Sequence, residues 1–372
     1  MIHFGQISSE EFLAEYWQKK PLLIKHAIPN FISPLSPDEL AGLSCEEEFE
    51  SRVVKGSTQR NDWTLESGPF KDDYFESMPK NDWTLLIQGV DKHILEVYEM
   101  IEEFNFIPRW RFDDVMVSFA AQGGSVGPHY DHYDVFLLQG LGSRHWQISS
   151  LDCNSNNYVK NSELRIMESF REEDAFITEP GDILYVPPGI AHHGTSLDSE
   201  CITLSFGYRS YSATEMMEVL ELKPHKPNND YYIDPNWLID IGNSEISNSA
   251  VNQALELLNI DQLPAEFFGC FVTRLDPFDQ QKLNEMMAFE EPIEIEESAS
   301  YILSPICRIA YQMIETELHV FINGESFDTE LFDQDLLIRF CNTRVIKINH
   351  QSTLLAKKLS SLHLIEKISD HN

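Results

Sequence analysis

Apolar residues near the start of the chain recur at helical spacing and then give way to short apolar runs. A stretch beginning at Ser9 carries apolar residues at helical spacing and stops at Pro21, so it predicts a helix that leads into a strand over residues 22–25. An acidic helical stretch follows. Two segments beginning with NDWTL, at Asn61 and Asn81, differ in their flanks and predict two unrelated strand starts rather than a repeat.

Between Asp113 and Gly207 the pattern changes to short runs rich in β-branched and aromatic residues. These runs are VMVSF, DVFLLQG, RHWQI, DILYVPP and CITLSFGY, and clusters of Gly and Pro separate them. Short strands divided by such turns are typical of all-β sandwiches and barrels. This block therefore predicts a β-rich domain.

Helical spacing returns after Tyr211. The segment TEMMEVLELK is followed by a Pro- and Asn-rich break at residues 224–229 and by two amphipathic stretches, Trp237–Leu258 and Ala265–Leu275. These stretches predict a small helical bundle.

Strand and helix patterns alternate in the last part of the chain, past the acidic segment Glu290–Ser298. Asn323-Gly324, placed between HVFI and ESFD, predicts a tight hairpin turn. At 372 residues the chain exceeds the usual length of one domain. We expect three zones: a β-rich domain with N-terminal helical elements at 1–211, a helical region at 212–275 and a small α+β domain at 276–372.

The charge balance is strongly acidic. There are 61 Asp and Glu residues against 27 Lys and Arg, which gives a formal net charge of −34. Such a charge repels the phosphate backbone that dominates nucleic-acid affinity, and it attracts a basic protein partner. The alternative is that acidity only keeps the protein soluble.

The cysteines and the N-terminal residues indicate an intracellular protein. None of the six cysteines forms a C-x-x-C pair, so neither a thiolate zinc site nor a secreted disulfide framework is indicated. The N-terminal residues lack the charged and apolar regions of a signal peptide, and no run of eighteen apolar residues occurs. We expect a soluble, cytoplasmic protein with no membrane association.

Candidate metal ligands lie just before one of the predicted strands. His129 and Asp131 are two positions apart, so on an extended backbone their side chains point to one face. The downstream segment EPGDILYVPPGIAHHG offers His192 and His193 as a third ligand. Two histidines and one carboxylate leave open positions on an iron(II) ion, which admit a 2-oxo acid and dioxygen.

Alternatives remain for each of these residues. A lone His-x-Asp pair is usually a solvated strand end. Neighbours on a strand face opposite sides, so only one of His192 and His193 points inward, and parity alone leaves the choice open. His132 and Asp134 repeat the same ambiguity, with a surface or supporting role as the alternative to metal binding.

Longer motifs around these residues resemble those of a known family. The segments FLAEYWQKKPLLI, RFDDVMVSFAAQGGSVGPHYDHYDVFLLQGLGSRHW, PGDILYVPPGIAHHG and NNDYYIDP are similar to those of the cupin-like JmjC oxygenases, and more closely to their bacterial ribosomal-oxygenase branch. The resemblance implies a JmjC double-stranded β-helix (jelly roll), a helical dimerisation region that forms a homodimer, and a C-terminal winged-helix-like domain. Its P-P-G-x-x-H pattern assigns the third ligand to His192.

The resemblance also implies iron(II) as the metal and 2-oxoglutarate as the cosubstrate, anchored by Arg144 with a contribution from Ser118. A fixed guanidinium can hold a carboxylate through two parallel hydrogen bonds, and a serine hydroxyl can donate a further one. The alternatives are an exposed Arg144 in the turn GLGSR and a Ser118 that is only packed. Thr203 stands where the family pattern leads us to expect Asn, which leaves its polar contact open.

By resemblance the reaction is hydroxylation of a protein side chain, as in arginine 3-hydroxylases that act on protein sixteen of the large ribosomal subunit. A basic ribosomal protein suits so acidic a chain as a partner, and no direct nucleic-acid contact is expected. Three alternatives compete: an N-methyl-lysine demethylase, a non-catalytic cupin-type scaffold, and a nucleic-acid-reading role for the C-terminal domain. The acidic segment DTELFDQDLLIRF disfavours the last of these.

Overall fold

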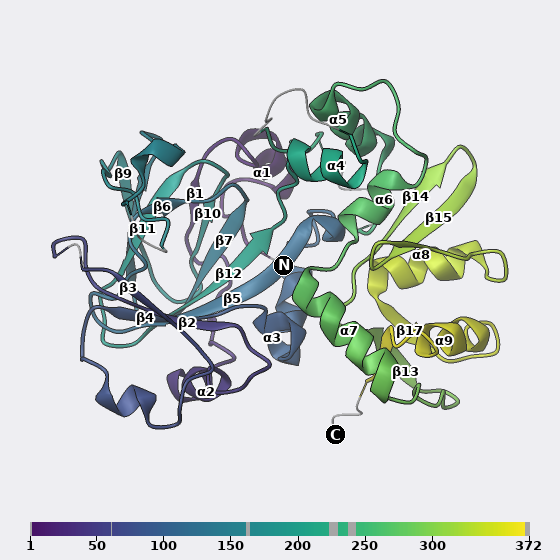
Figure 1. The fold of residues 1–372 in the computed structure, drawn as a ribbon, viewed down its shortest axis with the longest axis horizontal. Coiled ribbons are helices and arrows are strands. Elements are labelled where there is room, and N and C mark those ends of the chain that lie inside the picture. The colour runs from purple at the N-terminus through teal and green to yellow at the C-terminus, as the bar shows by residue number, and fades with distance from the viewer. Residues whose placement is uncertain (1, 61, 161–163, 223–229, 237–242, 369–372) are drawn as a thin grey trace. The chain divides into compact units, whose positions relative to one another are not determined.

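The computed structural model describes residues 2–60, 62–160, 164–222, 230–236 and 243–368 (Figure 1). The chain divides into two units, and a short segment of the first half belongs to the second unit. The first unit comprises residues 1–104 and 112–210, and the second comprises 105–111 and 211–372. The expected three-way division at residues 211 and 275 stays a prediction.

The first unit is built mainly of strands. Its helices and strands are α1 (Ser9–Glu15), β1 (Leu22–Ile24), α2 (Pro37–Leu43), β2 (Ser51–Lys55), β3 (Thr64–Ser67), β4 (Trp83–Ile87), α3 (Leu95–Glu99), β5 (Phe112–Ala120), β6 (His129–Tyr130), β7 (Val135–Leu141), β8 (Arg144–Ser149), β9 (Asp174–Thr178), β10 (Ile183–Val186), β11 (Ala191–Ser196) and β12 (Cys201–Tyr208). They form an eight-stranded sheet in the order β1-β10-β7-β12-β5-β4-β2-β3 and a four-stranded sheet in the order β6-β11-β8-β9. The five strand runs expected between residues 113 and 207 are confirmed as β5, β7, β8, β10 and β12.

Side chains of the eight-stranded sheet alternate between two packed faces, because successive strand residues point to opposite sides. On β7, Val135 and Leu137 pack with Trp146 of the four-stranded sheet. Phe136 lies on the other face, with its ring centroid 5.6 Å from that of Phe12 in α1. The two antiparallel sheets thus enclose one core, as expected for a jelly roll.

The second unit combines helices with two small sheets. Its elements are the 3-10 helix η4 (Arg109–Arg111), α4 (Ala213–Val219), α5 (Asn248–Leu258), α6 (Phe267–Val272), α7 (Pro277–Phe289), β13 (Ser300–Leu303), β14 (Ile309–Ile314), β15 (Glu317–Ile322), β16 (Glu325–Phe327), α8 (Gln334–Thr343), β17 (Val345–Lys347), α9 (Thr353–Ser360) and β18 (Ile365–Lys367). The sheets have the orders β17-β13-β18 and β14-β15-β16. The expected hairpin is confirmed: Asn323 and Gly324 have φ values of 52° and 88° between β15 and β16.

Of the helix expected over Trp237–Leu258, the structure shows α5 over Asn248–Leu258. Residues 237–242 lie outside the described residues, and α5 begins at Asn248 because the Ser247 side chain accepts a hydrogen bond from the Ala250 amide at 3.2 Å. Just before this cap, the amide of Ile246 donates to the carbonyl of Tyr311 at 2.7 Å. Residues 243–247, the described part of the stretch before α5, are therefore not helical. The winged-helix-like character of the C-terminal part stays a prediction.

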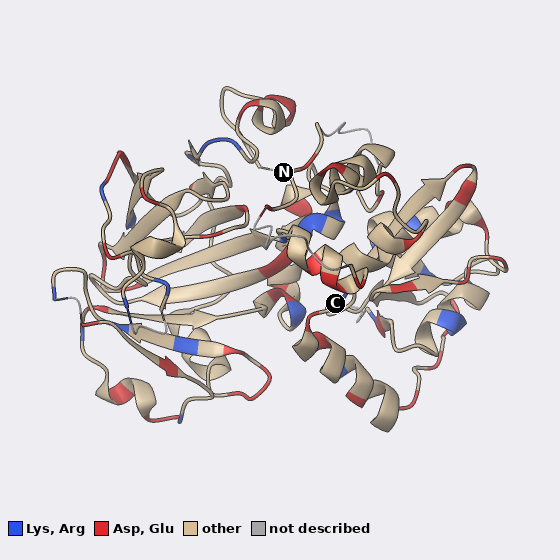
Figure 2. Cartoon of the chain, turned by 45° about the horizontal axis from the view of Figure 1, so that its top comes forward, with Lys and Arg blue, Asp and Glu red and all other residues tan. Residues whose placement is uncertain are grey.

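Acidic side chains occur on helices, strands and loops of both units, with far fewer basic ones between them (Figure 2). Across the residues that the structure describes, no helix combines the length and apolar character needed to cross a lipid bilayer.

Candidate metal centre

The structure brings His129, Asp131 and His192 together in the first unit. Strands β6 and β11 are antiparallel neighbours, and their register places His129 directly opposite His192. One potential ligand atom from each of the three residues lies within 4.8 Å of the others. The Asp131 Oδ2 atom is 3.8 Å from His129 Nε2 and 3.6 Å from His192 Nε2. Two imidazole nitrogens and one carboxylate oxygen therefore converge on a common point.

Backbone carbonyls orient both imidazole rings. His129 Nδ1 lies 3.0 Å from the Gly127 carbonyl oxygen, and His192 Nδ1 lies 3.4 Å from that of Ile190. A hydrogen bond from Nδ1 to a carbonyl leaves Nε2 free to bind a metal. Gly127 has a φ of 81°, and a Cβ there would meet Ile166 Cδ1 at 3.0 Å, so this turn requires glycine. The local sequence GPH thus helps to orient the His129 ring.

Burial keeps His192 in the form that binds metals. The residue is 3% exposed. Burial, reinforced by the neighbouring His129, lowers the pKa of His192 to about 4. The neutral imidazole is the metal-binding form, so this ligand is available near neutral pH.

The other histidine and acid of the two motifs lie outside the cluster. His193 faces away from His192, and its Nδ1 is 3.1 Å from Gln147 Oε1. Asp134 is 1% exposed and accepts hydrogen bonds from the Tyr185 hydroxyl at 2.5 Å and from the Gln18 amide at 3.1 Å. Asp134 is therefore a buried supporting group rather than a surface one.

A cavity of about 160 Å³ adjoins the three residues and contains both predicted cosubstrate contacts. Arg144 is 3% exposed, which excludes the exposed-turn alternative. Among the described residues, its Nε and Nη2 atoms are buried without a hydrogen-bond partner. A buried guanidinium is costly unless an anion pairs with it. An anionic ligand in the cavity would satisfy these two nitrogens.

Ser118 and Thr203 lie opposite each other on β5 and β12 and also line this cavity. The Ser118 hydroxyl donates to the Thr203 carbonyl at 3.4 Å, so it is held on the cavity side of β5. The Thr203 hydroxyl donates to Gln139 Oε1 at 3.4 Å. Ser118 therefore lines the same cavity as Arg144, and the Thr203 hydroxyl is already bonded to another side chain.

Sequence reasoning missed several cavity residues. Trp146 Nε1 and Thr84 Oγ1 are buried and have no hydrogen-bond partner among the described residues. Trp146 follows Arg144 by two positions on β8, a spacing that places both on one strand face and was visible in the run RHWQI. Asp113 and Asp114 also line the cavity, and burial raises the pKa of Asp114 to about 7.

Different parts of the cavity carry different chemical groups. The three converging ligands can hold a divalent metal with open positions, and Arg144 supplies a fixed positive charge in the same enclosed space. Asp114 accepts hydrogen bonds from the Gln88 side chain at 2.7 Å and from the Gly89 amide at 2.9 Å, and Asp113 Oδ1 lies 3.6 Å from Arg209 Nε. The arrangement is suited to a metal and an organic anion held together.

Comparisons with known proteins agree with this geometry. The family model described as JmjC domain matches residues 99–216. A protein of Escherichia coli strain K12 named ribosomal protein uL16 3-hydroxylase is 33% identical over 270 residues, which cover 71% of each chain. A probable ribosomal oxygenase of Haemophilus influenzae is 38% identical over 213 residues, which cover 57% of this chain and about half (52%) of that protein's length.

The fold also matches a solved structure over nearly its full length. The structure of YcfD, a ribosomal oxygenase from Escherichia coli in complex with cobalt and 2-oxoglutarate, has a TM-score of 0.67 and 25% identity and covers 98% of this chain and 99% of that one. The relatives and this structure carry the same oxygenase assignment as the JmjC match. The chain therefore belongs to the JmjC-domain ribosomal oxygenases.

Proposed function

We propose that this chain is an iron(II)- and 2-oxoglutarate-dependent hydroxylase that modifies an arginine side chain of a large-subunit ribosomal protein. One observation carries the proposal: the buried Arg144 guanidinium, two nitrogens of which have no hydrogen-bond partner in the described part of the chain, lines the same cavity as His129, Asp131 and His192. A ligand that suits this cavity should chelate the metal and carry a negative charge for Arg144. The anion 2-oxoglutarate does both.

The donor set fits iron(II). His129, Asp131 and His192 would hold the metal through two imidazole nitrogens and one carboxylate oxygen, which is the ligand set of non-haem iron oxygenases. When bound, iron(II) and 2-oxoglutarate together activate dioxygen for hydroxylation of a C–H bond. The protein's own part is to orient the three ligands through Gly127, Ile190 and the β6–β11 register, and to limit water around them.

The cavity also fits 2-oxoglutarate. Arg144 would bind its distal carboxylate, and Ser118 would add a hydroxyl donor from the neighbouring sheet. Trp146 Nε1 is a further donor in the same cavity. The related YcfD structure, which holds cobalt and 2-oxoglutarate, supports this assignment.

The acidic residues of the cavity favour a cationic substrate side chain. Asp114 lies on β5, whose alternate residues Met116 and Ser118 also line the cavity, and Asp113 precedes it on the same strand. A guanidinium entering the cavity would meet these carboxylates, and it would stabilise the ionised form of Asp114. The net charge of −34 attracts a basic ribosomal protein, and the Escherichia coli relative is named for uL16.

The proposal extends to assembly and location. We propose a homodimer formed through the helical region at 212–275, where Val219, Leu222 and Ile233 are large apolar side chains exposed by 40%, 44% and 65%. The same charge that favours a basic protein disfavours direct nucleic-acid binding. We place the enzyme in the cytoplasm, where ribosomal proteins are made.

Mass spectrometry of a defined reaction tests the function. Purified protein is incubated with iron(II), 2-oxoglutarate, air and a mixture of large-subunit ribosomal proteins, with the Asp131→Ala variant as the inactive control. The proposal predicts a gain of one oxygen on an arginine residue together with formation of succinate. Release of formaldehyde without that gain would instead support the demethylase alternative, and no 2-oxoglutarate consumption would overturn the proposal.

A further inference from the structure

Gln139 is a fully buried amide at the corner between β7 and β8. Its side chain is 0% exposed, and it follows Val135 and Leu137 on the strand face that points toward the four-stranded sheet. Gln139 is not among the residues that line the cavity. A buried amide is unfavourable unless its donors and acceptor are satisfied, so its partners decide what it does.

The amide of Gln139 is bonded on both its nitrogen and its oxygen. Its Nε2 donates to the carbonyl of Leu141 at 2.8 Å and to that of Ile202 at 3.1 Å. Its Oε1 accepts from the Thr178 hydroxyl at 3.0 Å and from the Thr203 hydroxyl at 3.4 Å. These four contacts reach the end of its own strand β7, its neighbour β12, and β9 of the other sheet. One side chain therefore ties the two sheets together.

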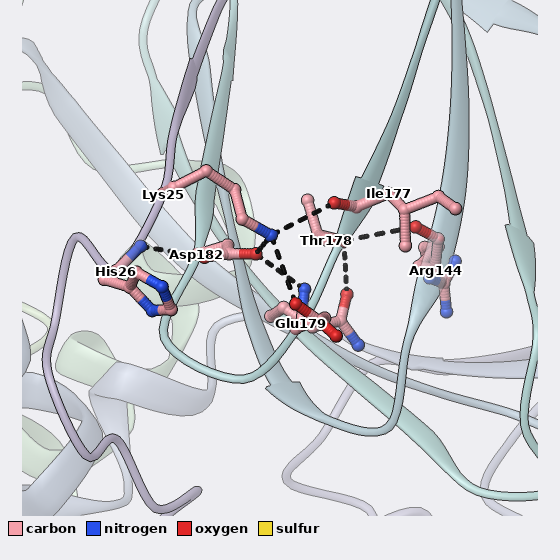
Figure 3. Close-up of polar contacts among 8 residues, drawn as sticks. Lys25, His26, Arg144, Ile177, Thr178, Glu179 and Asp182 are labelled. Carbon is pink, nitrogen blue, oxygen red and sulfur yellow. Dashed lines mark hydrogen bonds and ion pairs between the residues drawn. The ribbon is translucent and has the colours of Figure 1, made fainter.

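The two threonines lie opposite the two predicted cosubstrate contacts. Thr178 pairs with Arg144 in the β8–β9 register, and its hydroxyl is 3.4 Å from the Arg144 carbonyl oxygen, a contact that Figure 3 shows as a dashed line. Thr203 pairs with Ser118 in the β5–β12 register. Gln139 thus bonds directly to Thr178 and Thr203, which are the strand partners of Arg144 and Ser118.

A second network fixes the backbone of Gln139 itself. Its amide donates to the Asp182 carbonyl at 2.9 Å, and its carbonyl accepts from Gly181 at 2.9 Å. The buried Asp182 carboxylate pairs with Lys25 at 2.5 Å and accepts from the His26 amide at 2.8 Å, as Figure 3 shows. The side chain of Gln139 therefore extends from a fixed backbone position. A group that positions other residues needs such a fixed base.

We propose that Gln139 is a positioning residue that sets the separation of Arg144 and Ser118, and with it the fit of the 2-oxoglutarate carboxylate. The inference rests on the proposed function for the identity of the ligand. Hydrogen bonding to carboxylate depends steeply on geometry, so a small relaxation of either strand weakens the contact. A methionine can fill the same volume but cannot replace the hydrogen bonds of the Gln139 amide.

The test compares Gln139→Met and Thr178→Val with matched controls. Gln312→Met changes another buried strand glutamine in the second unit, and Thr195→Val changes a half-buried threonine on β11. The first measurement is the dissociation constant for 2-oxoglutarate, from the rise in melting temperature on titration in the presence of manganese(II). The second separates KM for 2-oxoglutarate from kcat. We expect roughly tenfold weaker binding and a matching rise in KM for both variants, with values like the parent protein for both controls.

The outcomes separate this inference from the proposed function. If Gln139→Met and Thr178→Val lower only the melting temperature and bind 2-oxoglutarate like the parent, Gln139 has a purely structural role and the inference is wrong. If the unsubstituted protein shows no binding of 2-oxoglutarate, the proposed function itself fails. Should Gln139→Met not fold, Thr178→Val alone decides, because it removes one hydroxyl at nearly constant volume.

Discussion

Replacing Arg144 with methionine should make the ligand-free protein more stable while it weakens 2-oxoglutarate binding. The guanidinium is 3% exposed, and two of its nitrogens have no hydrogen-bond partner among the described residues. Unsatisfied buried polar groups cost about 1–3 kcal/mol each, and more when charged. Methionine keeps much of the apolar contact with Trp146 without that cost, so we expect the free energy of unfolding to rise by about 1–3 kcal/mol.

The same substitution removes the main charge that the cosubstrate carboxylate would meet. Loss of one partner from a buried charged pair costs about 2–5 kcal/mol. The dissociation constant for 2-oxoglutarate should therefore rise roughly 30-fold to 5,000-fold. Urea unfolding with and without 2-oxoglutarate and manganese(II) measures both effects on one sample. The metal ligands are unchanged, so manganese binding alone should remain.

Arg171→Met is the matched control, because Arg171 is exposed in the loop before β9. Its substitution should change the free energy of unfolding by less than about 0.5 kcal/mol and leave cosubstrate binding intact. The reasoning is refuted if Arg144→Met destabilises the ligand-free protein by several kcal/mol and still gains as much stability from 2-oxoglutarate as the parent. Arg144 would then be a structural cation.

Three further predictions follow from the site and the assembly. Asp131→Ala and His192→Ala should each abolish 2-oxoglutarate turnover, measured as succinate formation, because both side chains face the cluster. His193→Ala should retain much of the turnover, because His193 faces away. An inactive His193→Ala with an active His192→Ala would contradict this assignment of strand faces. Asp114→Asn should raise the melting temperature more at pH 8 than at pH 5. Burial raises the pKa of Asp114 from 3.8 to about 7, so between these values the folded state holds a proton that the unfolded state has lost. The stability of the parent protein therefore falls as pH rises across that window, and the variant avoids this loss. An equal gain at both pH values would show that this pKa is not raised. Sedimentation at micromolar concentration should give twice the 42.9 kDa chain mass, and a monomer at every concentration would exclude the dimer through 212–275.

The cluster could be predicted from sequence because its signals are local. His129 and Asp131 occupy alternate positions of one extended segment, and the glycine- and proline-rich approach to His192 indicates a strand entering the same site. Arg144 was identified by resemblance, and its burial required the structure. The choice of His192 over His193 also came from the resemblance, because parity alone allows either, and the β6–β11 register places His192 opposite His129.

Long-range pairing determines what the sequence did not reveal. The burial of Asp134 depends on Gln18 and Tyr185, which lie far from it in sequence. The role of Gln139 depends on β9, and the residues of β9 are mostly exposed and carry little of the alternation that marks a strand. Residues 243–247 were predicted to be helical and are not, because a tertiary hydrogen bond of Ile246 competes with helix formation.

The register that places His129 opposite His192 also has a consequence for the order of synthesis. The ribosome delivers the chain from the N-terminus, so His129 in β6 and Asp131 just after it emerge about sixty residues before β11 brings His192. Until then the first pair lacks the partner that completes it. Of the first unit, only β12 remains to be made once β11 has emerged. A metal ion that needs all three ligands would therefore bind to a nearly complete domain, and it would stabilise a two-residue strand that has few backbone hydrogen bonds of its own.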